Sequence, residues 1–137
     1  MKTIKNNYLT VEIQEKGAQL WSIKDASEHE YLWQGDPAYW EDRAPNLFPY
    51  IARLTQGKYT LKGETYHMDI HGFAKDTVFE TEQPSDSKVV FHIGNTEETY
   101  KQYPFSLQFE ISYELVDKKL LVTYKAKKKK KKVMYFG

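Results

Sequence analysis

The sequence has 137 residues, of which 40% are hydrophobic, 28% are charged and 15% are aromatic, as is typical of one soluble globular domain or part of one. This aromatic content excludes a disordered chain, and the absence of cysteine excludes disulfide scaffolds, zinc–thiolate sites and thiol catalysis. The net charge is +1, but without the six lysines at 127–132 it is −5, so no basic surface for nucleic acid is spread over the rest of the chain.

The first predicted element is a strand over residues 8–14. Leu9, Val11 and Ile13 fall on one face of it, as expected when one side of a strand contacts a core. Residues 31–49 do not alternate, and they combine five aromatic side chains with three prolines. We therefore expect an ordered loop there, without a continuous helix or strand.

Two antiparallel strand pairs are predicted next. The first joins residues 58–61 to 65–68, because Gly63 in the intervening turn can adopt the positive φ that a tight hairpin needs. The second joins residues 78–82 to 88–93. Alternation with a period of two therefore continues through the middle of the chain.

The clearest alternation lies between residues 106 and 115, where one face is apolar throughout: Leu107, Phe109, Ile111, Tyr113 and Leu115. A turn at Asp117 and Lys118 then leads into a second strand over 120–125. Before this hairpin, residues 95–104 allow only a short helical turn, because Pro104 ends it. The sequence thus predicts an all-β protein with little helix.

The lysine run at 127–132 interrupts strand-like sequence. Six adjacent like charges repel one another, so a solvated loop is the favoured prediction. Binding of phosphate or anionic lipid is an alternative, but the run has neither interleaved aromatic residues nor an amphipathic pattern. The apolar residues 133–137 indicate the start of another segment.

Several short motifs occur in an order that resembles the aldose 1-epimerase, or galactose mutarotase, family, and in particular its bacterial LacX-like branch. The resemblance covers about residues 4–126 and resumes at 134–137. The motifs are Lys16-Gly17-Ala18-Gln19-Leu20-Trp21-Ser22-Ile23, Glu30-Tyr31-Leu32-Trp33-Gln34-Gly35-Asp36-Pro37, Tyr39-Trp40, Arg43-Ala44-Pro45-Asn46-Leu47-Phe48-Pro49, Arg53-Leu54, Gly57-Lys58-Tyr59, His71-Gly72-Phe73-Ala74-Lys75-Asp76, Glu98-Thr99 and Tyr103-Pro104-Phe105.

This resemblance implies an antiparallel β-sandwich of the galactose mutarotase-like type, of which residues 1–137 form the N-terminal part of a single domain, so that the sandwich is incomplete. It implies an enzyme that interconverts the α and β anomers of a hexose, or of a phosphorylated hexose, without a cofactor. In the family, a histidine and a glutamate transfer the protons, as general acid–base catalysis requires. The resemblance places both beyond Gly137, so we expect no catalytic residue in this chain and no activity from it alone.

The resemblance also identifies three sugar-binding candidates. Arg53 matches an arginine that donates hydrogen bonds to sugar hydroxyls, for which its fork of donors is suited. His71 matches a histidine that lines the sugar pocket. Lys75 stands where many members have arginine, which replaces a planar donor by a point charge. Ala52 stands where glycine is usual.

Other residues are assigned no role in a site. The remaining histidines have no metal-ligand spacing, so no metal site is expected; they are His29, His67 and His92. Asp36, Asp69 and Asp76 have no fixed separation that would indicate a glycosidase pair. Trp21 is predicted to lie in the core, whereas Trp33 and Trp40 could lie in the core or stack on sugar rings.

Two other kinds of function remain open. One is a carbohydrate-binding or sugar-sensing module without catalysis, and the other is an interaction protein that recruits an anionic partner through strand edges or the lysine run. Unpaired strand edges also predict homo-oligomers. Residues 1–10 lack the apolar stretch of a signal peptide, and no apolar run has the roughly 18–20 residues of a transmembrane helix. We therefore expect a cytoplasmic location and no membrane or nucleic-acid partner.

Overall fold

The computed structural model describes residues 1–137 and contains nine strands, one short α-helix and two 3-10 turns. The strands are β1 (Lys2–Lys5), β2 (Leu9–Gln14), β3 (Gln19–Asp25), β4 (Lys58–Leu61), β5 (Glu64–His67), β6 (Glu80–Ser85), β7 (Lys88–Gly94), β8 (Leu107–Val116) and β9 (Lys119–Lys128). The helix α1 is Glu97–Gln102, and the turns are Thr55–Gly57 and Ala74–Asp76. None of these helices is long and apolar enough to cross a membrane.

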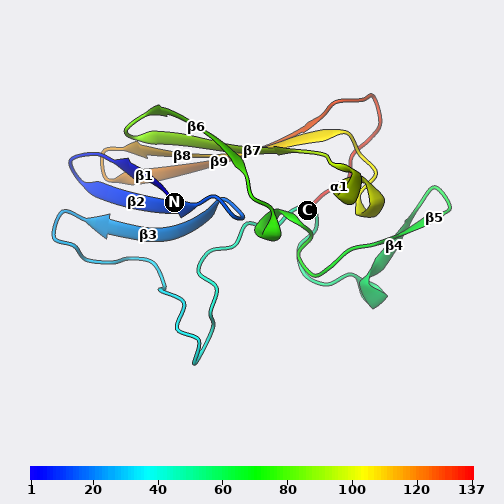
Figure 1. Ribbon diagram of the computed structural model, residues 1–137, viewed down its shortest axis with the longest axis horizontal. Coiled ribbons are helices and arrows are strands. Elements are labelled where there is room, and N and C mark those ends of the chain that lie inside the picture. Colours follow the sequence, from blue (N-terminus) through cyan, green and yellow to red (C-terminus); the bar gives the residue numbers. More distant parts are fainter.

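The strands form three antiparallel sheets. One has the order β1-β2-β3, another the order β6-β7-β8-β9, and β4 and β5 form a separate hairpin. The two larger sheets lie one above the other, and the hairpin projects at the end of the molecule away from the β1-β2-β3 sheet (Figure 1). The predicted all-β antiparallel sandwich is therefore confirmed.

Strand β8 is the centre of this arrangement. It pairs with β7 on one side and with all of β9 on the other, from Val116 opposite Lys119 to Leu107 opposite Lys128. The intervening turn has Asp117 at a φ of +52°, as a two-residue turn between right-twisted strands requires. The hairpin predicted from alternation is thus confirmed; β8 is displaced by one residue from the predicted range, and β9 extends further than expected at both ends.

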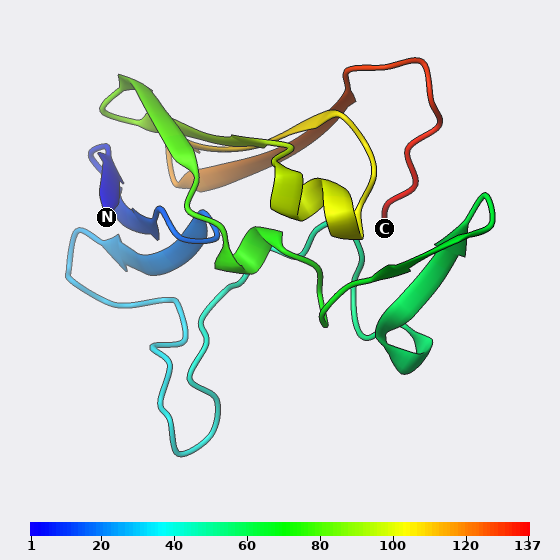
Figure 2. The same cartoon turned by 45° about the vertical axis from the view of Figure 1, so that its right-hand side comes forward.

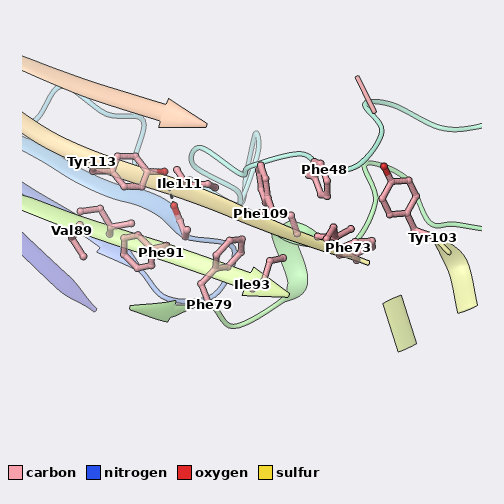
Figure 3. Close-up of a cluster of buried hydrophobic side chains, with 14 of the residues drawn as sticks. Phe48, Phe73, Phe79, Val89, Phe91, Ile93, Tyr103, Phe109, Ile111 and Tyr113 are labelled. Atoms are coloured by element: carbon pink, nitrogen blue, oxygen red, sulfur yellow. Dashed lines mark hydrogen bonds between the residues drawn. The ribbon is translucent and has the colours of Figure 1, made fainter. Parts of the chain in front are cut away.

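The core lies between the two larger sheets. Every residue of β8 on its inner face is buried, because the alternation places five apolar side chains, from Leu107 to Leu115, on one side. At one end of the core, Phe91 and Tyr113 pack edge to face, and at the other the ring of Phe48 stacks on Phe109 with centroids 4.2 Å apart (Figure 3). Phe48 thereby fixes the segment after the long loop against the sheet.

The loop over residues 31–49 contains no helix and no strand, as predicted. Its C-terminal end is held by a buried hydrogen-bond network. The Asn46 amide nitrogen donates to the carbonyls of Gly17 and Ala18, at 2.9 Å each, and its oxygen accepts from the Tyr124 hydroxyl at 2.8 Å. The Tyr113 hydroxyl donates to the Ala18 carbonyl at 2.7 Å. The loop is therefore joined to both sheets.

Strands β1 and β3 were not predicted, because neither has an alternating apolar face. In β3 the fully buried residues are the polar Gln19 and Ser22, whereas Trp21 is only partly buried, so hydrophobic alternation is absent. In β1 only Ile4 is buried. The predicted core position of Trp21 is wrong, because its ring lies near the surface with the Arg43 guanidinium 4.0 Å above it.

Two predicted boundaries also differ from the structure. Strand β6 begins at Glu80, and Val78 before it forms an isolated bridge with Lys16. The lysine run is not entirely a loop, because Lys127 and Lys128 continue β9 opposite Gln108 and Leu107. Backbone pairing with a long neighbouring strand overrides the repulsion that favours a loop at these two positions.

Candidate functional site

The predicted residues Arg53 and His71 are brought together by a cross-connection between two loops. The Ala52 backbone N–H donates to His71 Nδ1 at 2.8 Å, and the His71 N–H donates to the Ala52 carbonyl at 3.0 Å. The chain reverses direction between these residues through the β4–β5 hairpin. Arg53 therefore follows immediately after the residue that holds His71.

This connection requires an unusual backbone. Ala52 and His71 each have a φ of +67°, in the left-handed region that costs a non-glycine residue roughly 1–2 kcal/mol. Such strain persists only where the surrounding structure enforces it, and it is concentrated at functional sites. The positive φ also explains why glycine suits position 52, where this chain has alanine.

Gly72 sets the position of His71 against the core. Its φ is +74°, and a Cβ there would lie 2.2 Å from the Phe48 carbonyl oxygen. That oxygen also accepts the N–H groups of Phe73 and Ala74, at 3.0 and 3.2 Å. Only glycine allows this approach, so the histidine–glycine pair is fixed to the packed end of the sandwich.

The hydrogen bond at His71 determines its tautomer. Because Nδ1 accepts the Ala52 N–H, the proton of the neutral ring is on Nε2. This assignment follows from the hydrogen-bond network. His71 thus offers an N–H donor from a partly buried ring that its backbone contacts hold in place.

Arg53 is exposed and lines an open polar groove of about 500 Å³. Residues from the β4–β5 hairpin, from the segment after it and from α1 form the rest of the groove: Gly57, Thr65, His67, Met68, Asp69, Ile70, Glu98, Lys101 and Gln102. The hairpin is tied to the helix, since the Tyr59 hydroxyl donates to the Gln102 carbonyl at 2.8 Å. A groove with this polar lining is suited to a small hydroxylated ligand.

Three wholly or partly buried tyrosines, Tyr50, Tyr59 and Tyr103, pack against one another next to this groove. Burial raises the pKa of Tyr50, and burial together with neighbouring tyrosines raises the pKa values of Tyr59 and Tyr103. All three stay protonated across the physiological range, so Tyr59 and Tyr103 remain hydrogen-bond donors. Their hydrogen bonds, from Tyr59 to Gln102 and from Tyr103 to Tyr135, hold the neighbouring segments in place. We assign no proton transfer to them.

Lys75 lies in a different groove from Arg53. Its Nζ is 2.6 Å from Asp76 Oδ2, and Lys16 approaches the same carboxylate at 4.0 Å. These residues line a smaller cavity of about 210 Å³ together with Trp21. The structure thus places Arg53 in one groove and Lys75 in another, whereas His71 lines neither groove and is connected to Arg53 through the backbone of Ala52.

Several groove residues were not identified from the sequence. His67 was given no role, yet it lines the groove beside Arg53, as do Asp69 and Gln102. They come from three elements whose relative position depends on how the hairpin folds against α1. Spacing in the sequence contains no signal for such a contact.

The two other tryptophans lie on the long loop. Trp33 and Trp40 are 42% and 50% exposed, so they do not belong to the core. The indole N–H of Trp33 donates to the Trp40 carbonyl at 2.9 Å. In addition, the structure contains no group of three or more histidine, aspartate or glutamate side chains that could hold a metal ion.

The fold and the groove define a β-sandwich protein with an open polar groove at one end of its core. The sequence model of the family described as aldose 1-epimerase matches residues 1–137. Protein LacX of Lactococcus lactis subsp. lactis is 34% identical over 122 residues, which are 85% of this chain and 41% of LacX. The chain therefore belongs to the aldose 1-epimerase family, as its motifs indicated.

Solved structures agree with this assignment. A galactose mutarotase related enzyme from Lactobacillus acidophilus is 38% identical and superposes with a TM-score of 0.95, over 98% of this chain and 45% of that one. A galactose mutarotase-like protein from Lactobacillus casei is 39% identical with a TM-score of 0.95, over 99% and 47% of the two chains. The chain thus spans less than half the length of these relatives.

Proposed function

We propose that the protein is an aldose 1-epimerase-like isomerase and that residues 1–137, as the N-terminal part of a single sandwich domain, supply sugar-binding groups. The observation that carries this proposal is the cross-connection between Ala52 and His71. It joins the backbone next to Arg53, whose side chain lines a polar groove, to the ring of His71, which has a free Nε2–H donor. An arginine fork and an imidazole N–H are donors that suit a ligand with adjacent hydroxyl oxygens.

In the proposed reaction, a base removes the proton from the anomeric hydroxyl and an acid protonates the ring oxygen as the bond from that oxygen to the anomeric carbon breaks. Rotation of the aldehyde end and ring closure then give the other anomer, with no net gain or loss of atoms. The residues of this chain bind and orient the ring, and general acid–base groups elsewhere in the complete protein transfer the protons. No cofactor takes part.

Lys75 is not assigned to the sugar groove in this proposal. Its ammonium group and that of Lys16 both lie near the Asp76 carboxylate in the smaller groove, which Glu41 and Asp42 also line. Three carboxylates against two cations disfavour a phosphate substituent there. We therefore expect Lys75→Ala to leave binding of a free hexose in the Arg53 groove unchanged.

A sugar-binding protein without catalysis is the second candidate. The presence of Arg53 and His71, with no proton-transferring pair assigned among the 137 residues, favours it. The intact mass of the protein isolated from its own cells separates the two. A mass well above 16.2 kDa, together with catalysed mutarotation of freshly dissolved hexose in a polarimeter, supports the isomerase. Hexose binding without any increase over the spontaneous rate of mutarotation supports the sugar-binding module.

A further inference from the structure

The lysine run, residues 127–132, is held at both ends. Its first two residues are paired in β9, and the Lys129 N–H donates to the Ser106 carbonyl at 2.8 Å. After the run, the Tyr103 hydroxyl donates to the Tyr135 carbonyl at 2.6 Å, and the Gly137 N–H donates to the Pro49 carbonyl at 3.0 Å. The backbone is therefore held in place both before and after the run.

Alternate lysines of the run lie on the same side. Lys128, Lys130 and Lys132 line one shallow depression together with Tyr100 of α1 and Phe105. Strand β9 ends at Lys128, and the bends at residues 129–132 bring Lys130 and Lys132 to the same side as Lys128. In Figure 2 the segment after β9 passes beside α1, on the side of the molecule where the β4–β5 hairpin projects.

The depression adjoins a larger groove of about 360 Å³, since Tyr100, Phe105 and Lys132 line both. The larger groove also contains the side chains of Tyr66 and Tyr135. Tyr100 and Tyr135 are 42% and 56% exposed, so much of their surface is available to a ligand. The fold thus places Tyr66, Tyr100 and Phe105 beside the lysines, although no aromatic residue is interleaved in the run itself.

The lysines of the run have no carboxylate partner. The ion pairs of the protein involve other cations, and Glu64 is the one carboxylate among the residues that line the two grooves. Several ammonium groups on one side of a short segment repel one another, and an anion between them removes that repulsion. The site therefore favours a ligand with several negative charges.

We propose that these adjoining grooves bind an organic oligophosphate such as a nucleoside triphosphate. The phosphates contact Lys128, Lys130 and Lys132. The nucleobase lies against the tyrosines, because an aromatic side chain can stack on any of the bases. Neither Arg53 nor His71 lines these grooves. The site is thus separate from the proposed sugar groove.

Calorimetric titration of the 137-residue protein with ATP, without divalent metal and at low salt, tests the phosphate half of the proposal. Two triple variants have the same net charge: K128Q/K130Q/K132Q removes the lysines of the depression, and K127Q/K129Q/K131Q is the matched control. We expect saturable binding that the first variant weakens about tenfold and the control less than about threefold. Equal weakening, or no saturable binding by the wild type, overturns the site.

The ring half is tested by comparing ATP with inorganic triphosphate. We expect ATP to bind more tightly than triphosphate, and Tyr100→Ala to weaken ATP binding about threefold or more while triphosphate binding stays the same. Unchanged melting temperatures show that the variants are folded. If Tyr100→Ala affects neither ligand, or both equally, the ring does not lie against this tyrosine and that part of the proposal is wrong.

Discussion

The packed middle of the sandwich and the site segment over residues 48–72 are built in opposite ways. Around Ile111 the backbone is regular, the inner side chains are fully buried, and the chain alternates with a strict period of two. In the site segment the backbone on both sides of the β4–β5 hairpin is irregular, and Ala52, Gln56 and His71 all have positive φ. Packing therefore stabilises the middle of the sandwich, and part of that stability offsets the backbone strain that holds the His71 ring in place.

The largest expected effect on stability comes from the packed middle. Ile111→Ala removes a side chain with no exposed surface, so it should lower the free energy of unfolding by about 2–5 kcal/mol. Urea denaturation measures this loss. Val122→Ala on β9, where the side chain is 37% exposed, is the control and should cost less than about 1 kcal/mol. Equal losses would mean that β8 is not the centre of the core.

Gly72→Ala tests whether the site segment is fixed by close backbone approach. The added Cβ meets the Phe48 carbonyl oxygen, so the loop must shift, and we expect a loss of about 2–3 kcal/mol. Because His71 moves with the loop, hexose binding should weaken in the folded variant, as calorimetry can measure. Gly63→Ala, at a turn with no atom within 4 Å of the new Cβ, separates steric conflict from the cost of positive φ. A Gly72 variant with normal stability and binding would contradict the role of this contact.

Asn46→Ala breaks the network that joins the long loop to both sheets. It leaves the buried Gly17 carbonyl and the Tyr124 hydroxyl without this partner, while the Ala18 carbonyl keeps the Tyr113 hydroxyl, so the expected loss is about 1–3 kcal/mol. Tyr124→Phe removes one hydrogen bond from an exposed residue of the same network and should cost about 1 kcal/mol or less. Thermal unfolding of both variants gives the ranking, and a larger loss in the tyrosine variant would reverse the assignment.

The smallest expected effect has the opposite sign. Ala52→Gly relieves the strain at φ +67° while adding flexibility to the unfolded chain, so it should stabilise the protein by about 0.5–1 kcal/mol. Hexose binding should not change, since the backbone groups that hold His71 remain. Destabilisation by glycine would show that Ala52 contributes packing that outweighs its strain.

Alternation was sufficient to predict β2, the β4–β5 hairpin and the β8–β9 hairpin, because each has an apolar face that matches the period of a strand. It missed β3, where Gln19 and Ser22 are buried. For the candidate site, motif order selected Arg53 and His71 as sugar-binding candidates, but neither the cross-connection of Ala52 with His71 nor the place of His67 in the groove follows from spacing. Contacts made by irregular loops depend on backbone geometry, which side-chain patterns do not specify.

The central claim is that Arg53 and His71 bind a hexose, and titration of the isotopically labelled protein with D-galactose or D-glucose tests it most directly. We expect saturable shifts of the backbone amide resonances of Ala52, Arg53 and His71, because Ala52 and His71 form the cross-connection and Arg53 lines the groove. Arg53→Ala should abolish the saturation, and Lys118→Ala, at a surface turn, should not. Saturable shifts confined to other residues, or the same affinity in Arg53→Ala, would contradict the account.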